Sequence, residues 1–388
     1  MRLLFVKESL GWPLANGHDV HCFHRMQALA RLGHEVSLLT ATEPPPPLLE
    51  RLQLTLQRTF PTDGKVAAES LRLSRLQERF RSYWGVSPAR IAAVPRVAEE
   101  CRADAVIVDG LNALPYLGAV EGRCRVWHAG DEWAWHHLSQ IQLSRPSTWS
   151  EIRLALIKGL YEHAYGSLVD RIWLVTKTDR RAMRWVTGVR NIDVIPNGVD
   201  GEHYRPIEQP QGERSCVFWG RLDFGPNIQA LQWFCQRIWP SVRRQAPDAR
   251  FTIYGFCLSE PVRALACQEG VTIIPDLPDL RAEVARHQVV VLPVVSGGGI
   301  KNKLLEAASM GKAIVSTAKA CLGLRLEGPP PLLAPHGIQE WVQALLSLWQ
   351  DADRRNALGS AARLWVLKNH SWTAMAQEAV ASLESRQR

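Results

Sequence analysis

Residues 296–317 read SGGGIKNKLLEAASMGKAIVST and place three glycines directly before two lysines and a glutamate. The run Val289–Val295 precedes them and shows no polar alternation, which is typical of a strand buried on both faces. Lys312–Thr317 is a second short apolar run. We therefore expect a strand, a glycine loop, a helix over about 303–310 and a return strand, with Gly311 as the helix C-cap.

The glycine loop has the chemistry of an anion site. A loop that enters a helix presents unpaired backbone N–H groups and the positive end of the helix dipole. Lys301 and Lys303 add positive charge beside Gly297, Gly298 and Gly299. The helix N-terminus and the two lysines together favour phosphate as the ligand. Neither a GxxxxGK[ST] loop nor a GxGxxG fingerprint is present, which argues against an ATPase and a dinucleotide-dependent oxidoreductase.

The rest of the chain repeats the alternation of short apolar runs and helix-length segments. The expected strands of the first half are Leu3–Val6, Val36–Leu39, Ala105–Val108, Arg125–His128, Ile172–Val175 and Ile192–Ile195. Those of the second half are Cys216–Trp219, Phe251–Tyr254, Val271–Ile274, Val289–Val294 and Ala313–Ser316. The pattern predicts an α/β protein with two doubly wound, Rossmann-like domains that face each other across a cleft.

The domain boundary is expected near IPNGVDGEHYRP, residues 195–206, because Asn197-Gly198 is a turn signal and a residue before proline disfavours helix. We expect an N-terminal domain over 1–195, a C-terminal domain over 196–368, and a last helix over 369–388 that crosses back onto the N-terminal domain.

Composition narrows the functional class. The 388 residues suit two domains, and the formal net charge of +8 permits an acidic partner without naming one. The eight cysteines are scattered, so reduced thiols are favoured over a zinc site. Met1–Val6 is far shorter than a signal-peptide core or a membrane span. We expect a cytoplasmic protein, with peripheral attachment to the inner membrane face left open.

Four ordered motifs carry a resemblance to a known family. GGGIKNKLLEAASMGKAIVST resembles the donor-nucleotide motif of the retaining GT-B-fold glycosyltransferases called glycosyl transferases group 1 (family 4). It is most similar to a bacterial polysaccharide-associated branch that reads GGGxKxKxLEAxAxGxPVV. IPNGVDGEHYRP resembles the interdomain segment, and VFWGRLDFGPNIQALQWF with PDARFTIYG resembles the start of the nucleotide domain. FVKESLGWPLANGHDVHCFHRMQALARLGHEVSLLT resembles the family's first βαβ unit.

The resemblance has two departures. The family's first glutamate falls on Gly298, and the phosphate-binding lysine that follows its GR pair falls on Pro226. The GGGxKxK branch shares both changes, which indicates that Lys301 or Lys303 replaces the lost charge. We favour Lys301, because it is nearer the glycines.

The resemblance also implies donor-binding roles for single residues. Glu306 would accept hydrogen bonds from the ribose hydroxyls, although a first-turn glutamate that pairs with Lys303 or Asn302 would look the same in sequence. Arg221 would clamp a diphosphate, and its alternative is a surface ion pair with Asp223. Gly17 would let the backbone approach the substrate, or it simply forms a turn with Asn16.

The stretch HAGDEWAWHH, residues 128–137, follows a predicted strand. In the resembling family a His or Asp here lies beside the transferred sugar, so Asp131 and His128 are the catalytic candidates. A strand-end structural histidine is the alternative for His128. The nearby tryptophans Trp127, Trp133 and Trp135 suit either acceptor stacking or core packing.

Residues 71–96, LRLSRLQERFRSYWGVSPARIAAVPR, are rich in arginine interleaved with apolar and aromatic residues. Such a segment suits contact with an anionic membrane, and a solvated helix face is the alternative.

The sequence thus predicts a retaining hexosyltransferase that moves a sugar from a nucleotide-diphosphate sugar to a glycan or lipid-linked acceptor in polysaccharide synthesis. We expect the enzyme to need no cofactor and no metal, and we do not expect nucleic acid as a partner. A nucleotide-sugar epimerase and a non-catalytic GT-B-like binding protein are the alternatives.

Overall fold

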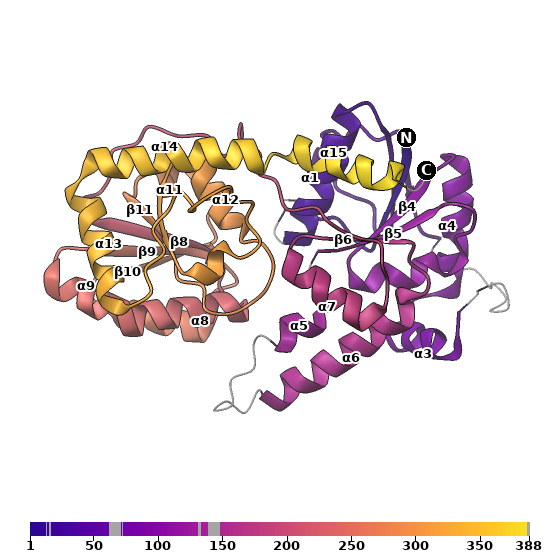
Figure 1. Cartoon of the computed structure of the whole chain (residues 1–388), viewed down its shortest axis with the longest axis horizontal. Coiled ribbons are helices and arrows are strands. Elements are labelled where there is room, and N and C mark those ends of the chain that lie inside the picture. The colour runs from indigo at the N-terminus through magenta and orange to yellow at the C-terminus, as the bar shows by residue number, and fades with distance from the viewer. Residues whose placement is uncertain are drawn as a thin grey trace. The chain divides into compact units, whose positions relative to one another are not determined.

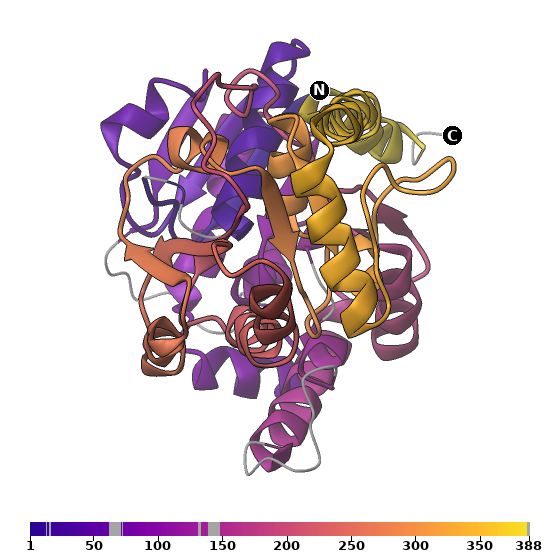
Figure 2. The same cartoon turned by 90° about the vertical axis from the view of Figure 1, so that its left-hand side faces the viewer.

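The computed structural model describes residues 1–12, 14, 17–61, 71, 73–130, 133–138 and 148–385. The chain forms two compact units, drawn in Figure 1 and Figure 2. Unit 1 comprises Met1–Asn197 and the chain from Trp372 onward, and unit 2 comprises Gly198–Ser371. The division after Asn197 lies close to the boundary that the sequence places after residue 195.

Unit 1 is built on a seven-stranded sheet with the order β3-β2-β1-β4-β5-β6-β7. Every pairing is parallel. Its strands are β1 (Arg2–Lys7), β2 (Glu35–Thr40), β3 (Leu56–Thr59), β4 (Ala105–Asp109), β5 (Cys124–Gly130), β6 (Arg171–Leu174) and β7 (Ile192–Val194).

Helices cover both faces of this sheet, because alternate residues of each strand enter different cores. Leu4 and Val6 of β1 join one core, whereas Leu3 and Phe5 join the other. The helical elements are α1 (Gly17–Arg31), α2 (Pro46–Leu49), α3 (Arg75–Tyr83), α4 (Pro88–Glu100), the 3-10 helix η2 (Leu111–Ala119), α5 (Trp133–Leu138), α6 (Thr148–Gly166), α7 (Lys177–Thr187) and α15 (Trp372–Glu384).

The C-terminal helix α15 belongs to the core of unit 1 and packs beside α1. The ring of Trp372 stacks on His24 with a centroid separation of 5.2 Å. Farther along the helix, Trp173 Nε1 donates to Ser382 Oγ over 3.0 Å. The sheet of unit 1 is therefore covered on this face by the first and the last helix of the chain.

Unit 2 has a five-stranded parallel sheet with the order β10-β9-β8-β11-β12. Its strands are β8 (Ser215–Arg221), β9 (Arg250–Phe256), β10 (Val271–Pro275), β11 (Val289–Leu292) and β12 (Ala313–Ser316). Its helices are α8 (Gly225–Trp233), the π-helix η3 (Phe234–Ile238), α9 (Trp239–Gln245), α10 (Glu260–Arg263), the 3-10 helix η4 (Ala264–Cys267), α11 (Arg281–Ala285), α12 (Asn302–Ser309), the 3-10 helix η5 (Ala318–Cys321), α13 (Ile338–Gln350) and α14 (Ala352–Asn369).

Each sheet has one point where the strand order reverses, between β1 and β4 in unit 1 and between β8 and β11 in unit 2. Ligands of open α/β sheets bind beyond the carboxyl ends of the strands at such points. The loop that follows β11 contains the three glycines, so the fold puts the predicted phosphate loop at the reversal point of unit 2.

The eleven strands predicted from the sequence are all present, and β3 is the strand that the sequence analysis missed. Its residues LQRT are mostly polar and lie at the edge of the sheet, where half-exposed positions need no apolar pattern.

Candidate active site

The glycine loop of unit 2 leads into α12, which begins at Asn302 and ends at Ser309, close to the predicted range. Gly297 and Gly299 have φ of 84° and 67°, in the left-handed region that favours glycine. A Cβ at Gly297 would also lie only 3.1 Å from Pro226 Cγ. No side-chain hydrogen bond caps the start of α12, and the Leu304 amide in its first turn donates to the carbonyl oxygen of Lys301 over 2.8 Å.

Lys303 reaches from the first turn of α12 to the carboxyl end of β8. Its Nζ donates to Asn227 Oδ1 over 2.8 Å and lies 4.1 Å from the ring centroid of Phe218. A Cβ at Gly220 would lie 2.8 Å from this Nζ, so glycine at that position makes room for the ammonium. Burial lowers the pKa of Lys303 to about 7. The charge of Glu306 opposes this shift, and the charge of Lys301 adds to it.

Lys301 is turned back toward its own loop. Its Nζ donates to the carbonyl oxygen of Gly298. The residue is the N-cap position of α12. Both lysines predicted from the sequence therefore lie at the glycine loop, but only Lys303 extends to β8 and α8.

Glu306 lies one turn into α12 and is held by two aromatic residues. Its Oε2 accepts a hydrogen bond of 2.9 Å from Trp219 Nε1, and the Tyr204 side chain also hydrogen-bonds to it. Burial raises the pKa of Glu306, and the Trp219 bond and the charge of Lys303 oppose this shift. The carboxylate is thus oriented by its surroundings before any ligand binds.

Arg221, at the end of β8, forms a bidentate ion pair with Asp223 in which both hydrogen bonds are 2.7 Å long. The pair is exposed to solvent. This is the alternative arrangement that the sequence left open for Arg221, and its predicted contact with a diphosphate would require exchange of this partner.

In unit 1, Gly17 is the exposed first residue of α1. Asn16, with which a turn was considered, lies outside the described residues. The next residue, His18, packs its ring against the end of β5, where a Cβ at Gly130 would lie 3.2 Å from His18 Cε1. Gly130 has φ of 70°, so both its backbone and its space suit glycine.

His128 is almost fully buried in β5 and belongs to a charged network at the strand ends. Its Nδ1 lies 2.5 Å from Asp109 Oδ2, and Asp109 Oδ1 lies 2.7 Å from Lys7 Nζ. Burial opposes ionisation of Asp109, but Lys7 and then His128 outweigh it and hold the pKa of Asp109 well below its usual range. Because an ionised carboxylate only accepts, His128 Nδ1 carries the hydrogen in this bond.

The imidazole of His128 is neutral at neutral pH. Burial lowers its pKa to about 4, and the charge of the buried Arg25 adds to this effect. With hydrogen on Nδ1, the Nε2 atom is a lone-pair acceptor, and it has no hydrogen-bond partner among the described residues. Lys7, His18 and Asp109 line a cavity of about 320 Å³ at these strand ends.

The other residues predicted in this stretch are Asp131 and three tryptophans. Asp131, the other catalytic candidate, lies outside the described residues, as do the side chains of Trp133 and Trp135. Trp127 is fully buried in a core cluster of unit 1, which is the packing role weighed for it.

Comparison with known families gives two matches that follow the two units. Residues 15–203 match the family described as Glycosyltransferase Family 4, and residues 213–351 match Glycosyl transferases group 1. The chain belongs to the group 1 glycosyltransferases.

Solved structures support the GT-B fold of this glycosyltransferase. Anabaena HepE in complex with UDP and glucose matches with a TM-score of 0.66 and 16% identity, over 99% of this chain and 100% of HepE. A sucrose-phosphate synthase from Thermosynechococcus elongatus matches with a TM-score of 0.70 and 16% identity, over 100% and 99%. S. aureus TarM in a complex that includes UDP matches with a TM-score of 0.67 and 11% identity, over 99% and 100%.

A curated relative is also similar in sequence. It is described as an uncharacterized 44.6 kDa protein in the cps region of Klebsiella pneumoniae, and it is 29% identical over 112 residues. The match spans 27% of this glycosyltransferase and 29% of the relative.

The sequence analysis missed the residues that hold the glycosyltransferase's predicted groups in place. Asn227 positions Lys303, Trp219 and Tyr204 position Glu306, and Asp109 positions His128. Trp219 ends the apolar run of β8 and Asp109 directly follows that of β4, so their positions near strand ends were a usable signal. The pairing of each with its partner depends on the fold.

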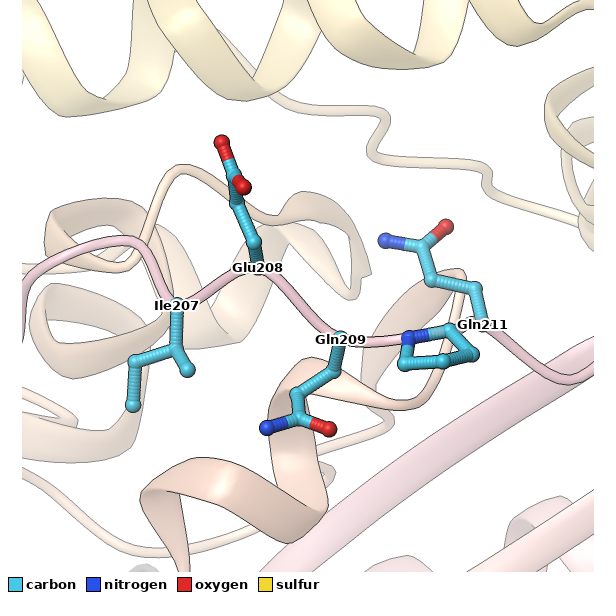
Figure 3. Close-up of a pocket in the computed structure, with 5 residues that line it drawn as sticks. Ile207, Glu208, Gln209 and Gln211 are labelled. Carbon is cyan, nitrogen blue, oxygen red and sulfur yellow. The ribbon is translucent and has the colours of Figure 1, made fainter.

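We also searched the described residues for metal-binding groups and for a second pocket. No group of three or more His, Cys, Asp or Glu in the described ranges could hold a metal ion, and all eight cysteines are free thiols. A second hollow, of about 460 Å³, follows the segment 207–211 (Figure 3), where Glu208 and Gln211 point to one side and Gln209 to the other. It holds none of the predicted site residues.

Proposed function

We propose that this glycosyltransferase moves a hexose from a nucleoside-diphosphate sugar to a glycan or lipid-linked acceptor, with retention of configuration, in cell-surface polysaccharide synthesis. Unit 2 binds the nucleotide and unit 1 the acceptor. The observation that carries the proposal is the ammonium of Lys303 beside Gly220 and Asn227 at the reversal point of the sheet. The UDP named in the HepE and TarM structures and the cps region named for the Klebsiella relative support it.

Lys303 is the better candidate for the missing phosphate-binding lysine, which revises the preference for Lys301. In the resembling family that lysine comes at the position of Pro226, and Lys303 Nζ is held by the next residue, Asn227. Asn227 offers a neutral oxygen, so this partner does not neutralise the ammonium before an anion binds. Lys301 contributes its charge and its backbone at the start of α12.

These groups suit the departure of a nucleoside diphosphate. When the bond between the anomeric carbon and the diphosphate oxygen breaks, its electron pair goes to the diphosphate, and Lys303 with the α12 amides would stabilise that charge. Glu306, oriented by Trp219 and Tyr204, would accept hydrogen bonds from the ribose hydroxyls. We propose that no metal is needed, because lysine and helix N-terminus supply the positive charge.

In unit 1 Asp109 fixes the ring of the neutral His128, and its buried Nε2 would accept a hydrogen bond from a sugar hydroxyl only after the side chains that cover it move. Asp131 stays a sequence prediction for the same surroundings.

The test is a donor screen of UDP-, GDP- and ADP-sugars with product analysis. A thermal shift identifies the donor, because a ligand at 100 times its Kd stabilises by about 2.7 kcal/mol. Slow release of free nucleotide and free sugar is expected, and EDTA leaves its rate unchanged. A binding protein would release nothing, and an epimerase would return an epimerised nucleotide sugar. Loss of turnover in EDTA with recovery in magnesium or manganese would refute metal independence.

A further inference from the structure

Helix α6 exposes an apolar stripe that no described element covers. Trp149, Leu156 and Leu160 recur at i, i+7 and i+11 and so lie on one side of the helix. Trp149 is 79% exposed, and both leucines are more than half exposed. Such exposure is unusual for tryptophan, because burial of its large apolar ring contributes strongly to the free energy of folding.

Helix α7 adds positive charge and a second exposed tryptophan. Arg181, Arg184 and Trp185 lie on its solvent side, and Trp185 is 88% exposed. Neither arginine forms an ion pair or a hydrogen bond through its guanidinium with any residue of the described ranges. The helix therefore presents unneutralised cations next to an aromatic ring.

Contacts between the helices make the two features continuous. His163 continues the stripe of α6, and its Nδ1 hydrogen-bonds to the carbonyl oxygen of Val186, directly after Trp185, over 2.9 Å. On the opposite flank of α6, Gln77 of α3 donates to the carbonyl oxygen of Ala164 over 2.7 Å. These contacts join the C-terminal end of α6 to α7 and to α3, and the three helices are neighbours in Figure 1.

We propose that Trp149, Leu156 and Leu160 of α6 with Arg181, Arg184 and Trp185 of α7, here called the α6–α7 face, dock on an anionic lipid membrane surface. Tryptophan and leucine suit the boundary between headgroups and acyl chains, and the arginines suit anionic headgroups just above it. No described helix is both long and apolar enough to cross a membrane. The face would therefore lie on the bilayer rather than span it.

Charge argues against a second copy of the chain as the occupant. A two-fold dimer places the same patch on both sides of its interface, so the arginines of both copies would gather there, and the α6–α7 face has no carboxylate among its six residues to pair them. An anionic bilayer supplies the opposite charge instead.

The inference relocates the membrane contact that the sequence suggested for residues 71–96. Ile91, Val94 and Val97 of α4 are buried in a core of unit 1, and Arg81 of α3 pairs with Glu78. Within that segment, α3 lies beside α6 and exposes Leu76 and Tyr83, so it can extend the α6–α7 face but does not form its centre.

The test is flotation of the full chain with vesicles of phosphatidylcholine, with and without phosphatidylglycerol. The wild type is expected to float with the anionic vesicles and to be released by salt. Arg181→Gln with Arg184→Gln should lower the partition coefficient about 30-fold. Trp149→Ser with Trp185→Ser should lower it about tenfold or more. All four side chains are exposed, so the variants are expected to fold normally.

The matched control is Arg237→Gln with Arg354→Gln, which removes the same charge from exposed positions of unit 2 and should leave flotation unchanged. Equal flotation of the wild type and the α6–α7 variants would overturn the proposal. So would a concentration-dependent dimer, measured by light scattering, that the tryptophan variant abolishes. Vesicle binding requires no sugar donor, so its failure would leave the proposed transfer reaction standing.

Discussion

Each unit holds a lysine at its strand reversal point, and the two lysines differ in burial and in the charge of their partner. Lys7 is buried, and Lys303 is partly buried. Lys7 ends β1, and its Nζ lies 2.7 Å from a carboxylate oxygen of Asp109. The Nζ of Lys303 lies 2.8 Å from the amide oxygen of Asn227. Burial lowers the pKa of both lysines, but the attraction of Asp109 outweighs it for Lys7, whose pKa rises. For Lys303 burial prevails, and the pKa falls to about 7.

This difference indicates that Lys7 has a structural role and that Lys303 has a role in ligand binding. Lys7 is neutralised inside the protein, so an incoming anion would have to displace a buried carboxylate. Lys303 has no carboxylate within ion-pairing distance among the described residues, and a bound diphosphate would supply the missing charge. Removing Lys7 should therefore affect folding, and removing Lys303 should affect ligand binding.

The largest expected effect is that of Lys7→Met on the stability of unit 1. It leaves Asp109 buried without its cation, which costs about 3–5 kcal/mol of unfolding free energy. Hydrogen exchange of the β1 and β4 amides measures this loss, and the amides of unit 2 serve as the internal reference. Lys7→Met combined with Asp109→Leu should recover part of the loss. Wild-type protection in the single variant would contradict the structural role of Lys7.

Acid should destabilise unit 1 through His128. The folded pKa is about 4 and the ordinary value is 6.5, so between these values the unfolded state binds more protons. The contribution of His128 to the unfolding free energy is fully present above about pH 6.5. It is lost as the pH falls toward 4, and the loss is up to about 3 kcal/mol. Exchange of the β4 and β5 amides across this range measures it. A slope that persists unchanged in His128→Asn would mean that another group is responsible.

Lys303→Met should weaken UDP binding by about 10- to 150-fold, the equivalent of a charge-assisted hydrogen bond of about 1.5–3 kcal/mol. Unfolding free energy should stay level or rise, because the ammonium of Lys303 is partly buried without a carboxylate partner among the described residues. Calorimetry with UDP and urea unfolding provide the two measurements, with Lys301→Met as the matched variant expected to lose less affinity. A larger loss for Lys301→Met would restore the original preference for that lysine.

The smallest effect concerns pH. At about pH 7 the ammonium of Lys303 is partly deprotonated, and a bound diphosphate would raise its pKa, so binding takes up a proton. Affinity for UDP should be full below pH 7 and fall by up to about tenfold per pH unit above it. Calorimetry in buffers of different ionisation heats detects the proton. The same pH dependence in Lys303→Met would rule out Lys303 as its source.

Features that depend on neighbouring residues in the chain could be predicted from the sequence, and contacts between distant residues could not. Apolar runs identified eleven strands because a strand buried on both faces is encoded locally, whereas the polar edge strand β3 carries no such signal. The loop residues and Glu306 were found through local motifs. The approach of Lys303 to Asn227 joins residues that are far apart in the chain, so it is fixed only when α12 packs beside β8 and α8.

The position of α15 has a consequence for how the protein is made. Its buried residues Trp372, Met375 and Leu383 complete a core of unit 1, although the ribosome has by then synthesised all of unit 2. Unit 2 is thus inserted into unit 1, and its two ends lie together, since Val199 N donates to the carbonyl oxygen of His370 over 2.7 Å. All residues of unit 2 are thus made before unit 1 has all of its own, and the first residues of unit 1 must wait for α15. A nascent chain that stops before residue 372 would therefore leave the older half of the protein, and not the newer one, exposed to chaperones and proteases.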